Sequence, residues 1–172
     1  MKKKSSDVLS KAILISLILI VLDLIGGFAH IKFTSWFKWI STIVIIGSLV
    51  IACINYGKQH DEVTFGKVFG YAFKISLFIS IFMTVYSFIS NYVIFPEFID
   101  QALQNAREGM EARGGMTEDQ IDAGMAMTKK FMQPVPLGIF SFVITLFVGV
   151  IGSLLGAAFA KKSEASVFQN NP

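Results

Sequence analysis

The chain has one cysteine, Cys53, and two histidines, His30 and His60. A lone cysteine excludes a disulfide within the chain and a metal site built on several thiolates. The topology derived below places the two histidines on opposite sides of a membrane, which leaves no nucleophile–base pair and no two-histidine metal site within one chain. There is also no glycine-rich loop followed by Lys-Ser or Lys-Thr that could cradle a phosphate. We therefore expect no enzyme, no metal and no cofactor.

Charged residues are also scarce. They make up 16% of the chain, against 53% hydrophobic residues, and the mean hydropathy is +0.62. Soluble domains are about one-quarter charged, so the composition excludes an ordinary water-soluble protein. The net charge of +3 and the pI of about 9.0 do not indicate nucleic acid, because lysines flank the apolar runs, as they do in membrane proteins. The expected partner is the lipid bilayer.

Four apolar segments are long enough to cross a membrane, which takes about 20 residues as a helix. They cover residues 8–29, 36–56, 68–95 and 137–160. The first follows a lysine cluster, as a signal peptide would, but the apolar core of a signal peptide is only about 7–15 residues long. We therefore predict an uncleaved span, whereas cleavage would leave three. The fold class is an all-α membrane protein, with residues 1–172 forming one integral membrane domain.

The basic residues predict the orientation. With four spans, both termini and the connection between spans two and three share one side. Basic residues are denser on that side than on the other, and they are Lys2, Lys3, Lys4, Lys11, Lys58, Lys67, Lys161 and Lys162. The positive-inside rule makes it cytoplasmic. We predict a multi-pass protein of the inner membrane with both termini in the cytoplasm.

The connection between spans three and four, residues 96–133, has a helical pattern of its own. Apolar residues recur three and four positions apart on either side of Gly114-Gly115, and Thr117 and Gln120 form a capping box. The segment has seven acidic and four basic side chains, a net charge of −3. We predict an extracytoplasmic helical hairpin between spans three and four.

Several motifs resemble one known family. They are TFGKVFGYAFK at residues 64–74, Pro-Glu-Phe at 96–98, MTEDQI at 116–121 and MAMTKKF at 125–131. With these motifs the chain resembles the bacterial integral-membrane family catalogued as domain of unknown function 4199, over essentially its whole length. The resemblance implies a four-span inner-membrane protein. It brings no assigned activity and therefore no catalytic residues.

Asp23 is the candidate binding residue because a carboxylate within a span costs about 2.5–3.5 kcal/mol on insertion scales and marks a functional candidate. It could titrate in proton or ion handling, with His30 as a relay at the outer mouth. Alternatively, it is structural, either protonated or bonded to a neighbouring helix. Lys74 is a poor partner, because helix rise places it roughly 10 Å nearer the cytoplasm.

Small residues form ladders in the fourth span. Gly149, Gly152 and Gly156 recur with Ser153, Ala157 and Ala160 at four-residue spacing. Such ladders let helix backbones approach closely. They serve either packing within the bundle or self-association of the protein.

Two functions follow from these features. The first is a non-enzymatic scaffold or regulatory, accessory subunit that uses the external hairpin to contact itself or another membrane protein. The alternative is a small oligomeric proton- or ion-coupled transporter or channel, with Asp23 as the titrating residue. Against the alternative, the spans have few polar residues and no broken-helix signal.

Overall fold

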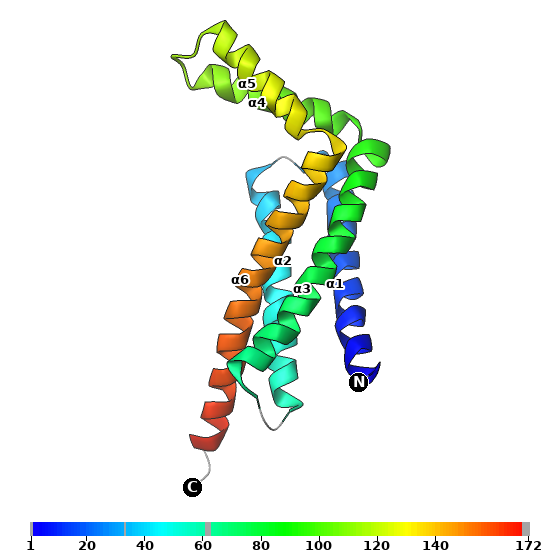
Figure 1. Cartoon of the computed structure of the whole chain (residues 1–172), viewed down its shortest axis with the longest axis vertical. Helices are drawn as coiled ribbons and strands as arrows, with labels where there is room; N and C mark the ends of the chain where they lie inside the picture. Colours follow the sequence, from blue (N-terminus) through cyan, green and yellow to red (C-terminus); the bar gives the residue numbers. More distant parts are fainter. Residues whose placement is uncertain (1, 33, 61–62, 170–172) are drawn as a thin grey trace. The chain divides into compact units, whose positions relative to one another are not determined.

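A computed structural model of the chain describes residues 2–32, 34–60 and 63–169 (Figure 1). For residues 2–5, 35, 38 and 161–169 it describes the backbone alone, so the lysine side chains predicted to flank the first and last spans, Lys2–Lys4 and Lys161–Lys162, lie outside the described set. Within these ranges the secondary structure is helical, without strands. The elements are α1 (Lys2–Phe28), α2 (Ser35–Lys58), α3 (Phe65–Ile89), the π-helical turn η1 (Ser90–Ile94), α4 (Glu97–Ala112), α5 (Glu118–Phe131) and α6 (Pro134–Gln169).

Four of these helical segments are long and apolar enough to cross a membrane, which confirms the predicted fold class. They are Ser6–Phe28, Trp39–Lys58, Phe65–Ile94 and Pro134–Ala160. The chain divides into two compact units, one of Met1–Met83 with Val143–Pro172 and the other of Thr84–Phe142. The two units are described in turn.

The first unit is a bundle of α1, α2, most of α3 and most of α6. Each helix contributes one apolar stripe to a common core, with Ala12 on α1, Leu49 on α2, Ile75 on α3 and Ala157 on α6 all fully buried. The start of α1, the end of α2, the start of α3 and the end of α6 lie at one end of this bundle (Figure 1). An even number of crossings requires this arrangement.

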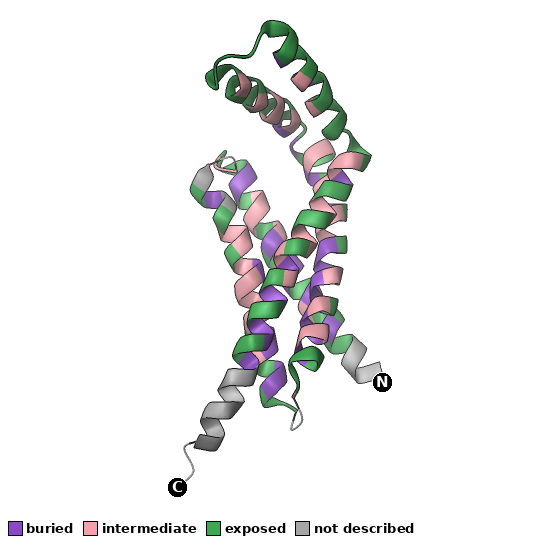
Figure 2. Ribbon diagram, turned by 60° about the vertical axis from the view of Figure 1, so that its left-hand side comes forward, coloured by how far each residue is buried: buried purple, intermediate pink, exposed green. Residues whose placement is uncertain are grey.

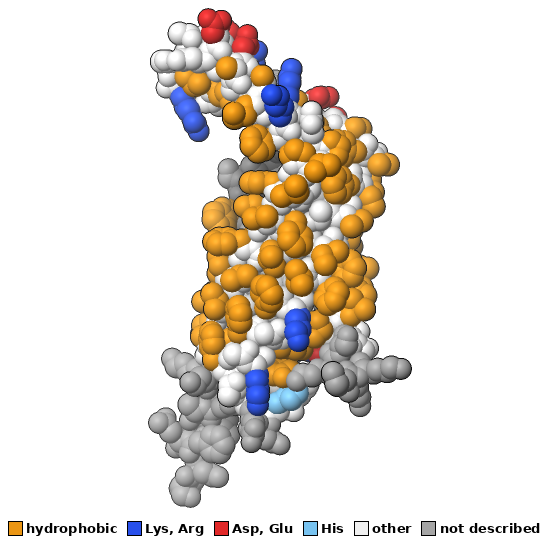
Figure 3. All heavy atoms as spheres, in the orientation of Figure 1, with side chains coloured by type: hydrophobic (Ala, Val, Ile, Leu, Met, Phe, Trp, Pro, Cys, Tyr) orange, Lys and Arg blue, Asp and Glu red, His pale blue; other side chains and the backbone are white. Residues whose placement is uncertain are grey.

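The outer surface of the bundle is apolar, unlike the polar surface of a soluble protein. Buried and exposed residues alternate along the long helices (Figure 2), and large apolar side chains such as Leu14, Trp39, Ile43 and Phe147 are exposed. Hydrophobic side chains cover the visible face of the long helices (Figure 3). Soluble proteins rarely expose an apolar patch larger than a few hundred Å². The bundle therefore suits a lipid solvent.

The second unit holds the end of α3, the turn η1, the hairpin α4–α5 and the start of α6. The third span, predicted as one helix over 68–95, ends instead in the wider π turn, in which the Phe95 N–H donates to the Ser90 carbonyl at 2.8 Å. Pro96 follows and has no N–H with which to continue the ladder. Chain entry into α4 is then stabilised by Phe95, whose ring stacks on Phe98 at 4.9 Å.

The hairpin α4–α5 folds as the periodicity predicts. The predicted apolar stripes are buried or half-buried, with Phe98, Ile121 and Met125 the most buried. The absence of a side chain at Gly124 leaves room for Met110, whose Sδ lies 3.0 Å from the position that a Cβ on residue 124 would occupy. The predicted capping box at the start of α5 is present, with the Gln120 N–H donating to the Thr117 hydroxyl and the Thr117 N–H donating to the Gln120 amide oxygen.

The last helix begins earlier than predicted. The last span was expected to start at residue 137, whereas Pro134 is the first residue of α6. Proline suits the first helical position because its missing N–H would have no partner there. The connection from α5 to the last span is consequently very short.

Candidate functional site

Asp23, the candidate binding residue, lies in the last turns of α1 beside a lysine. The Lys32 ammonium is 3.1 Å from both Asp23 carboxylate oxygens, and the side chains of Lys32 and Asp23 are only 21% and 23% exposed. Lys32 is nine residues further along the chain, just beyond the end of the helix. The carboxylate within the span is therefore paired with a cation from the connection that follows its own helix.

The end of α1 explains how Lys32 reaches back to Asp23. The Ile31 N–H donates to the Gly26 carbonyl and the His30 N–H to the Gly27 carbonyl, each at 3.0 Å. This is the Schellman arrangement, which reverses the chain through a residue in the left-handed region. His30 is that residue, with φ at +55°. It was the candidate proton relay in the transport alternative, and the structure places it at the helix cap with its side chain exposed.

Gly149, Gly152 and Gly156 face other helices of the same bundle. A Cβ on Gly156 would lie 2.6 Å from the Cys53 Sγ and 3.1 Å from the Val50 Cα, both on α2. On Gly152 it would lie 3.1 Å from another α2 backbone atom, the Ile46 Cα. The small residues of α6 thus pack against α2 and α3 of the same chain.

Buried serines continue this contact between α3 and α6. The Ser153 hydroxyl donates to the Gly149 carbonyl at 2.7 Å, and the Ser76 hydroxyl lies 3.1 Å from it. Ser76 also lies within hydrogen-bond distance of the Ala72 and Gly149 carbonyls, at 3.0 and 3.2 Å. A Cβ on Gly149 would meet the Ser76 Cβ at 2.6 Å. These hydroxyls satisfy one another and the backbone, as polar groups between apolar helices must.

A polar cluster that the sequence reasoning missed joins α1 to α3. The Tyr71 hydroxyl donates to the Asp7 carboxylate at 2.5 Å and accepts from the Lys11 ammonium at 2.5 Å, while Lys11 also pairs with Asp7 at 3.1 Å. Tyr71 is buried, and its ring stacks on Tyr56 of α2 at 4.3 Å. On the other side of Tyr56 lies the ring of His60, at 4.1 Å.

The spacing of Asp7 and Lys11, one helical turn apart, was a local signal for the ion pair. Nothing in the sequence identified Tyr71 as the third member, because it is 60 residues from Lys11. Within the cluster, the Asp7 carboxylate, the Lys11 ammonium and the Tyr71 hydroxyl each bond to the other two. It therefore tethers the start of α1 to the bundle rather than presenting a reactive group.

The tip of the hairpin α4–α5 has a second charged cluster. Arg107 on α4 pairs with Glu111 of the same helix at 2.8 Å and with Glu118 and Asp122 of α5 at 3.4 and 3.6 Å. The hydrogen bond to Glu111 raises the pKa of the Arg107 guanidinium above its ordinary value. Arg107 thus bridges the two helices on their exposed side, while acidic side chains around it face solvent.

Among the described residues, no group of three or more His, Cys, Asp or Glu side chains could hold a metal ion. Cys53, the single cysteine, is buried against Gly156. The arrangement supports helix packing and charge neutralisation within a membrane bundle.

Four lipid-facing apolar helices with a folded hairpin between the last two define a multi-pass helical membrane protein. Residues 10–162 match the family described as "Protein of unknown function (DUF4199)". The match covers most of the chain, and the protein belongs to this family, as its motifs indicated. No curated protein and no solved structure matches the chain.

Proposed function

We propose that this protein is a non-enzymatic scaffold or accessory subunit of the bacterial inner membrane, with both termini in the cytoplasm. The hairpin α4–α5 is the surface that contacts a partner membrane protein or a second copy outside the cytoplasm. The observation that carries the proposal is the hairpin itself, which has its own buried core, its own capping box and its own Arg107 bridge. A bare connection between two spans needs none of these.

The face of α4 turned away from α5 is the contact surface that we propose. Gln101, Asn105 and Glu108 are exposed and lie three or four residues apart, so they share one side of the helix. The side chains that face α5 are on the opposite side. A polar, rigid helix face of this kind is suited to a specific contact with another protein rather than to enclosing a solute.

The pairing of Asp23 favours the scaffold over proton-coupled transport. A titrating carboxylate in a transporter must exchange its proton or ion during each cycle, whereas the Asp23 carboxylate is held by Lys32 through both of its oxygens. The buried Ser76 and Ser153 hydroxyls bond to each other and to the backbone. These contacts stabilise a closed bundle.

Site-specific photo-crosslinking in native membranes tests the proposal. Benzoylphenylalanine at Gln101 or Asn105 should give a discrete crosslinked protein band, whereas the same probe at the lipid-facing Ile139 should not. Replacing residues 97–131 by a short Gly-Ser linker, with membrane insertion verified, should abolish co-purification of the crosslinked protein.

Two results would count against the scaffold. The first is the absence of any crosslinked protein from both positions on α4 while the chain is correctly inserted. The second is a pH-gradient-driven flux into proteoliposomes of the purified protein that Asp23→Asn abolishes, since this would make transport the function.

A further inference from the structure

A row of exposed apolar side chains runs from α5 into α6 within the unit Thr84–Phe142. Its members are four residues apart, and they are Met127 (64% exposed), Phe131 (59%), Val135 (67%) and Ile139 (61%). The core of the hairpin does not account for this row, because the buried residues of α5, Ile121 and Met125, lie on another side of the helix. Four large apolar groups in water would be unfavourable.

The second half of the row already belongs to the lipid-facing surface. Val135 and Ile139 lie in the apolar segment Pro134–Ala160. A helix of 27 residues is about 40 Å long, which matches a bilayer including its headgroup regions. Residues near Pro134 therefore lie at headgroup level, and Phe131 is only three positions before it.

Contacts at the base of the hairpin hold α5 to these spans. The Tyr92 hydroxyl donates to the Met132 carbonyl at 2.6 Å, which ties the end of the third span to the end of α5. A Cβ on Gly138 would lie 2.5 Å from the Phe88 ring, so the end of α3 and the start of α6 are in close contact. The end of α5 thus has a defined position beside the start of α6.

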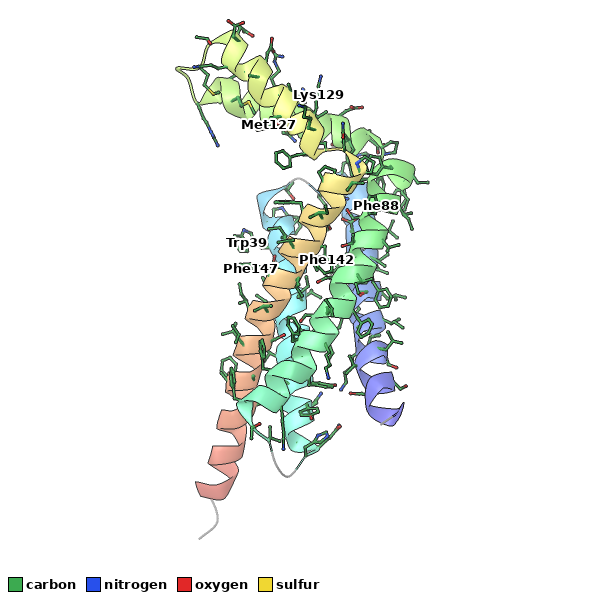
Figure 4. All side chains as sticks on the ribbon, viewed as in Figure 1. Trp39, Phe88, Met127, Lys129, Phe142 and Phe147 are labelled. Carbon is green, nitrogen blue, oxygen red and sulfur yellow. The ribbon has the colours of Figure 1, made fainter. Side chains whose placement is uncertain are left out.

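The charges of α5 suit a bilayer surface. Lys129 and Lys130 are exposed in its last turn. Met127 and Lys129 leave the helix on different sides, as Figure 4 shows, because two residues correspond to about 200° of rotation. An apolar stripe flanked by lysines is the pattern of helices that lie in the membrane interface, where lysine stems reach up to the headgroups.

We propose that Met127 and Phe131 insert into the boundary between headgroups and acyl chains, so that the last two turns of α5 lie on the bilayer and not free in water. The occupant of this face is lipid, because the exposed Met127 and Phe131 on α5 are followed, after a connection of only two residues between the helices, by the exposed apolar Val135 and Ile139 on α6. The inference does not depend on the scaffold proposal. It leaves the polar face of α4 accessible whether or not a partner binds there.

Spin labels in reconstituted full-length protein test this. In a Cys53→Ala background, single cysteines at Met127, Phe131, Ala126 and Ile139 carry a nitroxide in vesicles of phosphatidylcholine and phosphatidylglycerol. Collision with oxygen, which concentrates in lipid, is compared with collision with a water-soluble nickel chelate. Ile139 is the lipid control, and Ala126, exposed on another side of α5, is the water control.

We expect labels at 127 and 131 to collide more with oxygen than with nickel, as at 139, and the label at 126 to show the reverse. Nickel accessibility at 127 and 131 equal to that at 126 overturns the proposal, because the row then faces water. Protection of both positions from both reagents also overturns it, because protein then covers the row.

Discussion

The close approach of α6 to α2 can be tested at Gly156. A methyl group there would lie 2.6 Å from the Cys53 Sγ, 2.9 Å from the Cys53 Cβ and 3.1 Å from the Val50 Cα. Favourable contacts between heavy atoms begin at about 3.5 Å. In Gly156→Ala the two helices must therefore separate by several tenths of an ångström or more, because one of the crowded atoms belongs to the α2 backbone.

Two opposing effects set the magnitude. Inserting a methyl group into a packed core costs about 1–3 kcal/mol. Replacing glycine by alanine inside a helix stabilises it by about 0.5–1 kcal/mol. The clash is larger, so Gly156→Ala should lower the free energy of unfolding by about 1–2 kcal/mol. Gly47→Ala on α2 is the matched control, since nothing lies within 4 Å of its added Cβ, and it should be neutral or stabilising.

SDS titration of the protein in mixed micelles, followed by tryptophan fluorescence, measures these differences. Gly156→Ala should unfold at a lower SDS fraction than the wild type, and Gly47→Ala should not. The double variant Gly156→Ala/Cys53→Ala should recover part of the loss, because it removes the nearest atom, the Sγ. Equal midpoints for Gly156→Ala and Gly47→Ala would show that the helices do not meet at this glycine.

Two further predictions concern the charged clusters. Tyr71→Phe should lower the free energy of unfolding by about 1–3 kcal/mol, because it removes the hydroxyl between Asp7 and Lys11; the same SDS titration measures the loss, and an unchanged midpoint would refute a tethering role. Asp23→Asn and Lys32→Gln should each destabilise the bundle, whereas the double variant should lose less than the sum by about 0.5–3 kcal/mol; strict additivity in this double-mutant cycle would show that the two side chains do not interact.

The local signals in the sequence predicted the elements that depend on neighbours along the chain. Long apolar runs predicted the four lipid-facing helices, because a helix satisfies its backbone hydrogen bonds internally wherever lipid is the solvent. The capping box at Thr117 and the apolar periodicity around it predicted the hairpin α4–α5, since both act within a few residues. The same signals were less accurate at the ends of spans, where Pro134 begins a helix and Ser90 begins a π turn.

The tertiary structure alone decided which side chains meet. Asp23 was predicted without its partner, because Lys32 reaches it only through the chain reversal at His30. Tyr71 joins Asp7 only when α1 and α3 lie together. The rotation of α6 in the bundle turns Gly152 and Gly156 toward α2 and Gly149 toward α3. Apolar composition determines that a helix enters lipid. Its rotation and neighbours follow from packing between surfaces far apart in the sequence.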